Sequence, residues 1–193
     1  EKIEHLFEND EDLKKFFKYT QIGSSKIKVM IDEILQIYKP NQNIKKEKIN
    51  LKEIINQIKV ILKDEFENVE IILEIEKLPE IKSSQNQILH IFQNLISNSI
   101  KYRNKDKPLV IKVDYESLEH DHLIIFEDNG IGIEKENLDK VFQLFFREKR
   151  VEHSQGIGIG LATCKKIIHH LNGKIWVHSE LNQKTQFFIS LPK

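Results

Sequence analysis

The 193-residue chain has few residues of several types, and each shortage narrows the class of protein to which it can belong. A single cysteine, Cys164, has no partner for an internal disulfide, which agrees with a reducing compartment. Because 30 basic residues balance 30 acidic ones, the formal net charge is zero, so we expect neither nucleic acid nor an anionic membrane as a partner. No apolar run approaches the roughly 18 residues that cross a bilayer, and no signal peptide opens the chain, so we expect a cytoplasmic location.

The sequence begins at Glu1 and contains one methionine, Met30. We therefore expect a fragment of a longer protein, in which any membrane attachment would lie in upstream segments. With 39% hydrophobic residues, the chain is long enough to bury one core and a small appendage.

The first 40 residues have a helical pattern. Apolar and small residues recur at alternating spacings of four and three, at Leu13, Phe17, Thr20, Ser24, Ile27, Ile31, Ile34 and Tyr38. This heptad-like seam is typical of a helical bundle or coiled coil, and a single amphipathic helix packed on its own domain is the alternative. Asn9 or Asp10 could cap the helix, and Pro40 would end it. Because residues 1–8 resemble the tail of an earlier helix, we expect residues 1–45 to form part of a dimerisation hairpin.

Residues 41–48 are polar and predict a linker, and residues 46–193 then alternate between helix and strand patterns. Asn50 is a predicted N-cap, and Ser84 with Gln87 predicts a capping box. The expected elements are a helix after residue 50, a strand at 69–75, a helix at 84–102, strands at 109–115 and 122–128, a short helix at 134–142, a helix at 159–171, and strands at 174–180 and 185–191. Because several strands form hairpins, we expect an α+β fold, a two-layer α/β sandwich whose mixed, mostly antiparallel sheet is covered by helices on one face.

The segment "QNLISNSIKY", residues 93–102, places two asparagines one helical turn apart. Asn94 and Asn98 share a helix face, with Lys101 and Tyr102 on roughly the same side. An amide oxygen is a hard, neutral ligand that suits a Mg²⁺ ion already carrying phosphate oxygens. An ordinary solvated helix face is the alternative.

The segment "EDNGIGI", residues 127–133, follows an apolar strand. Asn129-Gly130 is a common hairpin turn, but the residues that follow have helical spacing rather than that of a second strand. A carboxylate at the end of a strand can accept a hydrogen bond from an exocyclic amine such as that of adenine. Gly130 and Gly132 have no side chains that would keep a planar base from the backbone. A plain glycine turn is the alternative.

The segment "GIGIGLA", residues 156–162, places three glycines before a predicted helix. A helix N-terminus carries unpaired N–H groups and partial positive charge, which makes it a ready phosphate site. A flexible loop without a ligand is the alternative. The pattern lacks the Lys-Ser/Thr of a P-loop and the preceding strand of a dinucleotide fingerprint. The polar stretch 147–155 would form a flap that brings Arg147, Lys149 or Arg150 near phosphates.

Taken in order, these segments resemble the ATP-binding domain of sensor histidine kinases, within the GHKL family that includes DNA gyrase, chaperone and mismatch-repair ATPases. The resemblance covers residues 46–193. "NLISNSIKY" resembles the N box, "EDNGIGI" the first G box, "VFQLFFR" at 141–147 the F box, and "GIGIGLA" the second G box.

The resemblance implies a role for each matching residue. Asp128 would hold the adenine amine, and Asn98 would hold Mg²⁺. Asn94, Lys101 and Arg147 would act at the phosphates as catalytic groups. The remaining nucleotide-binding residues would be Tyr102, Gly130, Gly132, Phe142, Phe145, Gly156, Gly158, Gly160, Leu161 and Thr185, with Phe142 and Phe145 anchoring the lid.

Relatives that hydrolyse ATP usually carry a Glu as general base four residues before the Mg²⁺-binding Asn, where this chain has Asn94. The resemblance therefore implies an ATP-dependent protein-histidine kinase. Its cofactors would be ATP and Mg²⁺, and its partners a response-regulator receiver domain and a second copy bound through the N-terminal helices. His5 lacks the residues that follow the family's phosphoacceptor, so the acceptor histidine is expected on an upstream helix. Alternatives are an ATP-hydrolysing relative, a non-catalytic nucleotide-binding or dimerisation module, and a serine kinase of the anti-sigma type.

The sequence departs from the family's motifs in two places that bear on the lid, the flap expected over the phosphates. Ile157 stands where many relatives have Thr, which removes one hydroxyl near phosphate. The hairpin "LNQKTQF" lacks the glycines common before the family's Thr. Both bear on lid geometry and affinity rather than on the fold.

Overall fold

The computed structural model describes residues 11–38, 46–75, 78–148 and 157–193. Contacts divide the chain into two units, Glu1–Lys39 and Pro40–Lys193. In the first unit, α1 (Glu11–Tyr38) is one continuous helix, as the heptad-like pattern predicts. The predicted cap at Asn9 or Asp10, the earlier helix and the stop at Pro40 lie outside the described residues, so the hairpin and the boundary at residue 45 stay predictions.

The second unit is built on a mixed sheet of five strands, with the order β2-β4-β5-β7-β6. The β2 and β4 strands are parallel, and every other neighbouring pair is antiparallel. The strands are β2 (Ile71–Ile75), β4 (Leu109–Ser117), β5 (Asp121–Asp128), β6 (Lys174–Glu180) and β7 (Lys184–Pro192). The expected mixed, mostly antiparallel sheet is therefore confirmed.

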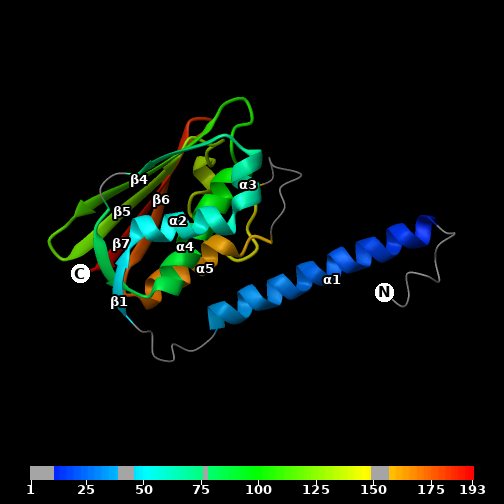
Figure 1. The fold of residues 1–193 in the computed structure, drawn as a ribbon, viewed down its shortest axis with the longest axis horizontal. Helices are drawn as coiled ribbons and strands as arrows, with labels where there is room; N and C mark the ends of the chain where they lie inside the picture. Colours follow the sequence, from blue (N-terminus) through cyan, green and yellow to red (C-terminus); the bar gives the residue numbers. More distant parts are fainter. Residues whose placement is uncertain (1–10, 39–45, 76–77, 149–156) are drawn as a thin grey trace. The chain divides into compact units, whose positions relative to one another are not determined.

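Three helices, α2 (Leu51–Ile61), α4 (Gln85–Lys101) and α5 (Gly160–His170), cover one face of this sheet (Figure 1). The short helix α3 (Lys63–Asn68) follows α2. The core lies between the two layers, where Phe92 of α4 meets Phe126 of β5 edge-on, with ring centroids 6.4 Å apart. Burying each of these side chains contributes about 1.5–3 kcal/mol, which holds α4 against β5, the strand that ends at Asp128.

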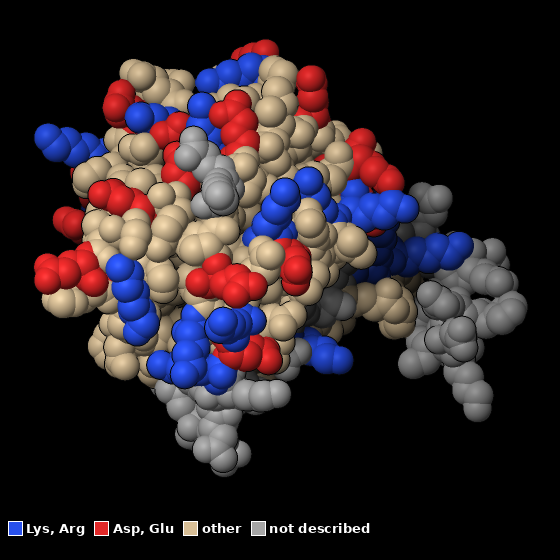
Figure 2. Space-filling model, turned by 60° about the vertical axis from the view of Figure 1, so that its left-hand side comes forward, with Lys and Arg blue, Asp and Glu red and all other residues tan. Residues whose placement is uncertain are grey.

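Both charge signs are interspersed over the face of the molecule drawn in Figure 2, in agreement with the balanced composition. Among the described residues, no helix combines the length and the apolar character that crossing a membrane requires.

A second, two-stranded sheet was not predicted. The strand β1 (Glu47–Asn50) pairs antiparallel with β3 (Glu80–Ser83), so the expected linker is wrong at residues 47 and 48. Ile49 and Ile81 face each other in the register, and both are buried. One apolar residue among polar neighbours gives no periodicity, and only the tertiary pairing shows why these short segments are extended.

Helix boundaries agree with the expected caps in one case and not in another. The Asn50 side chain accepts hydrogen bonds from the backbone N–H groups of Lys52 (3.0 Å) and Glu53 (3.4 Å), as an N-cap should. Ser84 occupies the N-cap position of α4, but its side chain makes no capping hydrogen bond. The buried Gln87 Oε1 atom has no partner among the described residues, so the expected capping box does not form.

The predicted helix at 134–142 is reduced to one 3-10 turn, Lys135–Asn137, followed by further turns. The Asn137 amide donates to Glu134 Oε2 (3.2 Å), and the backbone N–H of the same residue donates to the Glu134 carbonyl (2.8 Å). These bonds across three residues tighten the chain and replace the regular ladder of an α-helix.

Candidate nucleotide-binding site

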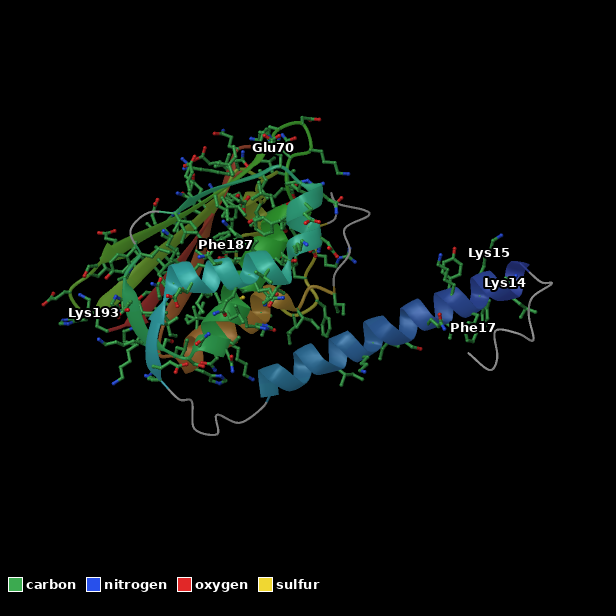
Figure 3. The ribbon with its side chains drawn as sticks, in the orientation of Figure 1. Lys14, Lys15, Phe17, Glu70, Phe187 and Lys193 are labelled. Atoms are coloured by element: carbon green, nitrogen blue, oxygen red, sulfur yellow. The ribbon has the colours of Figure 1, made fainter. Side chains whose placement is uncertain are left out.

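A pocket opens where the ends of β5 and β7 meet α4. It encloses about 580 Å³ of empty space, part of which is open to solvent. Seven predicted site residues line it: Asn98, Tyr102, Asp128, Gly132, Arg147, Leu161 and Thr185. Its other lining residues are Ile133, Val141, Phe146, Glu148 and Phe187. Phe187 of β7, labelled in Figure 3, is one of the apolar residues of this lining.

Asp128 is the last residue of β5, and its side chain is only 6% exposed. Its Oδ1 accepts a hydrogen bond from the Gly130 N–H, and its Oδ2 accepts one from the Ser99 hydroxyl, each at 2.9 Å. Burial raises the pKa of this carboxyl from 3.8 to about 6, although the two hydrogen bonds act in the opposite direction. The site therefore contains a fixed, buried hydrogen-bond acceptor at the pocket wall.

Thr185 lies directly opposite Asp128 in the register of β5 and β7. Its Oγ1 is 3.2 Å from the Ser179 Oγ, which donates to the Lys184 carbonyl (2.7 Å). The same Ser179 hydroxyl accepts the Ile133 N–H (2.9 Å). These bonds join the hairpin of β6 and β7 to the loop after β5. Asp128 and Thr185, the two polar groups of this pocket wall, therefore come from neighbouring strands.

The α4 helix brings Asn98 and Tyr102 to the pocket, while Lys101 lies beside it. The Lys101 Nζ is 4.5 Å from the centroid of the Tyr102 ring. The Tyr102 carbonyl accepts the Ile131 N–H (3.0 Å), which fixes the loop after β5 to the end of α4. Asn98 lines the pocket, and its side chain makes no hydrogen bond with the other described residues.

Asn94 does not line the pocket, but it contacts the start of α5. Its Nδ2 donates to the His90 carbonyl (3.1 Å). A Cβ added at Gly160 would lie 2.5 Å from the Asn94 Oδ1. The first asparagine of the predicted pair therefore faces the glycine at which the predicted phosphate-binding helix begins.

The two glycines after Asp128 differ in what they do. Gly132 lines the pocket with a φ of 71°, and a Cβ there would strike the Glu180 carbonyl oxygen. Gly130 lies outside the pocket wall, where a Cβ would be 2.7 Å from the Tyr102 carbonyl oxygen. Gly130 thus permits close packing of the loop against α4, and only Gly132 faces the predicted base site.

The second glycine segment is described from residue 157, so Gly156 lies outside the described residues. Gly158 has a φ of 80°, and its carbonyl accepts the Phe145 N–H (2.8 Å). Among the described residues, no side chain caps the start of α5 at Ile159. Leu161, one residue into this helix, lines the pocket.

The aromatic segment before the second glycine segment is divided between two environments. Phe142 packs edge-on against Phe187, with ring centroids 6.3 Å apart, and its predicted role of anchoring the lid stays a prediction. Phe145 is 52% exposed with a φ of 66°, and Phe146 lines the pocket in its place. Arg147 also lines the pocket.

Sequence reasoning missed Ser99 and Ser179, the two hydroxyls that hold this wall together. A signal for Ser99 was present, because it is a polar residue on the otherwise apolar buried face formed by Leu95, Ile96 and Ile100. Ser179 gave no such signal, since alternating polar residues are normal on a strand.

This fold is that of a recognised class of ATP-binding proteins. The family of histidine kinase-, DNA gyrase B- and HSP90-like ATPases matches residues 83–193. The chain belongs to this family.

Its relatives include sensor proteins. The chain is 33% identical over 184 residues to the phytochrome-like protein Cph1 of Synechocystis sp., covering 95% of this chain and 24% of Cph1. It is 31% identical over 198 residues to the sensor protein kinase WalK of Staphylococcus aureus, covering 98% of this chain and 32% of WalK. The chain therefore spans about a quarter to a third of the length of these curated relatives.

Solved histidine kinase structures share the fold. The Acinetobacter baumannii histidine kinase AdeS superposes with a TM-score of 0.74 at 21% identity, over 98% of this chain and 88% of AdeS. Full-length ShkA in complex with AMPPNP gives 0.74 at 15% identity, over 93% of this chain and 38% of ShkA. Histidine kinase ThkA in complex with the response regulator protein TrrA gives 0.73 at 22% identity, over 100% of this chain and 55% of ThkA.

Proposed function

We propose that this chain is the catalytic ATP-binding region of a sensor histidine kinase. It binds Mg-ATP and transfers the terminal phosphoryl group to a histidine on a helix outside this chain. The phosphoryl group then passes to an aspartate of a response-regulator receiver domain. The relatives named as sensor kinases and the ThkA–TrrA complex support this assignment.

The observation that carries the proposal is the buried Asp128 carboxylate at the wall of the pocket. A buried acceptor held by two hydrogen bonds suits the exocyclic amine of adenine, and the Thr185 hydroxyl lies across the strand pair from it. Val141 and Phe187 supply apolar surface for the flat base. Tyr102 also lines the pocket and would flank the nucleotide.

The phosphate end would be formed by α4 and the start of α5. Asn98 would hold Mg²⁺ through its amide oxygen, and the first backbone N–H groups of α5 would donate hydrogen bonds to phosphate oxygens. A bound Mg²⁺ neutralises charge on the phosphates. Arg147 also lines the pocket and would neutralise charge on the transferred group.

The chemistry requires positioning more than proton transfer. An imidazole nitrogen of the acceptor attacks the γ-phosphorus, a P–N bond forms, and the bond between the γ-phosphorus and the bridging oxygen breaks, so that ADP leaves. No general base has to activate water. The amide of Asn94, which cannot take a proton, is compatible with this reaction and not with base-catalysed hydrolysis.

The N-terminal helix would provide the dimer contact. The apolar seam of α1 includes Leu13, Ile27 and Ile31, all of which are exposed on the helix as described. A helix with such a seam buries it against a second helix, which in a dimer would come from another copy.

A phosphotransfer assay tests the proposal. The chain is incubated with Mg-ATP and a longer form of the protein that carries the acceptor helix and Asp128→Asn, so that only the tested chain can bind ATP. We expect acid-labile phosphate on the longer form. The matched control replaces the tested chain with its own Asp128→Asn variant, which should give none.

Three parallel measurements separate the alternatives. Binding of ATP without transfer would indicate a silent nucleotide-binding module, and steady release of inorganic phosphate without an acceptor would indicate a hydrolase. Acid-stable phosphate on a hydroxyl would indicate a serine kinase.

A further inference from the structure

The Asp128 carboxylate accepts two hydrogen bonds, one from the loop after β5 and one from α4. The Ser99 Oγ of α4 lies 2.9 Å from Oδ2, and the Gly130 N–H lies 2.9 Å from Oδ1. Ser99 is 2% exposed, and its hydroxyl is also 3.1 Å from the Leu95 carbonyl. A hydroxyl has one proton, so a bond to the carboxylate competes with the ordinary bond back to the helix.

The charge state of this carboxyl decides which bases it can recognise. An ionised carboxylate only accepts hydrogen bonds, whereas a protonated carboxyl also donates one. Adenine presents an amine donor at the position where guanine presents a carbonyl acceptor. An ionised Asp128 therefore favours adenine and opposes guanine, and a protonated Asp128 loses that distinction.

We propose that Ser99 is a positioning residue that keeps Asp128 a pure acceptor and thereby selects adenine over guanine nucleotides near neutral pH. This inference rests on the proposed binding of a nucleotide in the pocket. It assigns base selectivity to a side chain on the buried face of α4, in addition to the carboxylate itself.

The surroundings of Asp128 make its charge state sensitive to one hydrogen bond. Burial raises the pKa to about 6, the Gly130 and Ser99 hydrogen bonds lower it, and the negative charge of Glu127 raises it further. The neighbouring elements add little positive charge that would lower this pKa again. The partner residue on β4, Ile111, is apolar, and the one on β7, Thr185, is neutral. Arg147 and Glu148, which share the pocket, have opposite charges.

Removal of the hydroxyl should therefore move the pKa of Asp128 toward the physiological range. Each hydrogen bond to a carboxylate favours its charged form, and losing one is expected to raise the pKa by about one pH unit. Near pH 7 the Ser99→Ala protein would then hold a substantial protonated fraction, and its preference for adenine would fall.

The test compares ADP with GDP as probes. Their dissociation constants are measured by titration calorimetry between pH 5 and 8.5 for the wild type, Ser99→Ala, Ser99→Thr and the matched control Ser97→Ala, which changes an exposed serine of the same helix. The titration of the Asp128 carboxyl carbon is followed by NMR in each protein without nucleotide.

We expect the ADP-to-GDP preference of the wild type to decline below about pH 6 and that of Ser99→Ala to decline about one pH unit higher. Near pH 7 the Ser99→Ala preference should be roughly tenfold smaller than that of the wild type. Ser99→Thr, which keeps the hydroxyl, should restore both the preference and the carboxyl titration. Ser97→Ala should behave as the wild type.

The proposal is overturned if Ser99→Ala keeps the wild-type preference and the wild-type titration of Asp128, since the hydroxyl would then only bond to Leu95. The NMR titration needs no nucleotide, so an unchanged midpoint overturns this inference even where ADP binds well. Absence of ADP binding in the wild type would instead overturn the proposed function, together with the selectivity built on it.

Discussion

The substitution Asp128→Asn should stabilise the protein while abolishing its ligand binding. A carboxyl whose pKa rises from 3.8 to about 6 on folding costs the ionised native state about 3 kcal/mol at neutral pH. Asn has nearly the same shape and no charge. Its amide oxygen can accept the Gly130 N–H, and its amide nitrogen can donate to the Ser99 hydroxyl, which then bonds to Leu95.

The pH dependence of this gain follows from the direction of the pKa shift. Below about pH 4 the aspartate is protonated in both the folded and the unfolded protein, so the two proteins should be equally stable. Between about pH 4 and 6 the unfolded aspartate is ionised while the folded one keeps its proton, so the wild type loses stability relative to Asp128→Asn as the pH rises. Above about pH 6.5 the difference should level off near 3 kcal/mol.

Urea unfolding of both proteins from pH 4 to 8 measures this difference directly, because other titrating groups cancel between the two. Thermal melts at pH 7.5 should place the Asn variant several degrees higher. The ranking should reverse in saturating Mg-ATP, which would stabilise only the wild type. An Asn variant that is less stable at pH 7.5, or a difference that does not change with pH, would refute the reasoning.

Three further predictions concern the glycines and the cation. Gly132→Ala should lower the free energy of unfolding by about 2–4 kcal/mol, because Gly132 has a positive φ and an added Cβ would strike the Glu180 carbonyl oxygen. The control Gly23→Ala in α1, where a Cβ would have nothing within 4 Å, should not lower it. Equal melting temperatures of the two variants would contradict this prediction. Gly160→Ala should push Asn94 aside and slow phosphotransfer roughly tenfold or more with little change in ADP affinity, and a normal transfer rate would remove Asn94 from the phosphate end. Asn98→Ala should make ATP affinity insensitive to Mg²⁺ or EDTA, and wild-type Mg²⁺ dependence in that variant would show that the ion is held elsewhere.

The sequence sufficed for those elements whose signal is local. The strands that became β4, β5, β6 and β7 have strong apolar patterns, and the Asn50 cap is a property of four consecutive residues. Asp128 was identifiable because a carboxylate at the end of a buried strand is unusual. In the structure Asp128 is buried and accepts hydrogen bonds from Gly130 and Ser99.

The features that sequence reasoning missed depend on distant segments. The β1–β3 pair brings together residues 30 to 36 positions apart, and neither strand has an apolar pattern of its own. Ser99 and Asp128 are 29 positions apart in the sequence, and only the packing of α4 on the sheet brings their side chains into contact. The capping box failed for the opposite reason, since a correct local pattern at Ser84 did not form the expected bonds.

The pocket lies at one end of the sheet, and the opposite end is a suitable place for protein engineering. Asp128 and Thr185 lie at one end of β5 and β7, while Asp121 pairs with Pro192 at the other, and the Lys193 ammonium reaches the Leu118 carbonyl there (Figure 3). Seven residue steps of β5 separate the two ends, which is roughly 24 Å. A fluorescent reporter inserted in the turn at residues 118–120, or fused after Lys193, would therefore be remote from the pocket. Such a fusion would turn this fold into a nucleotide sensor whose reporting group does not compete with its analyte.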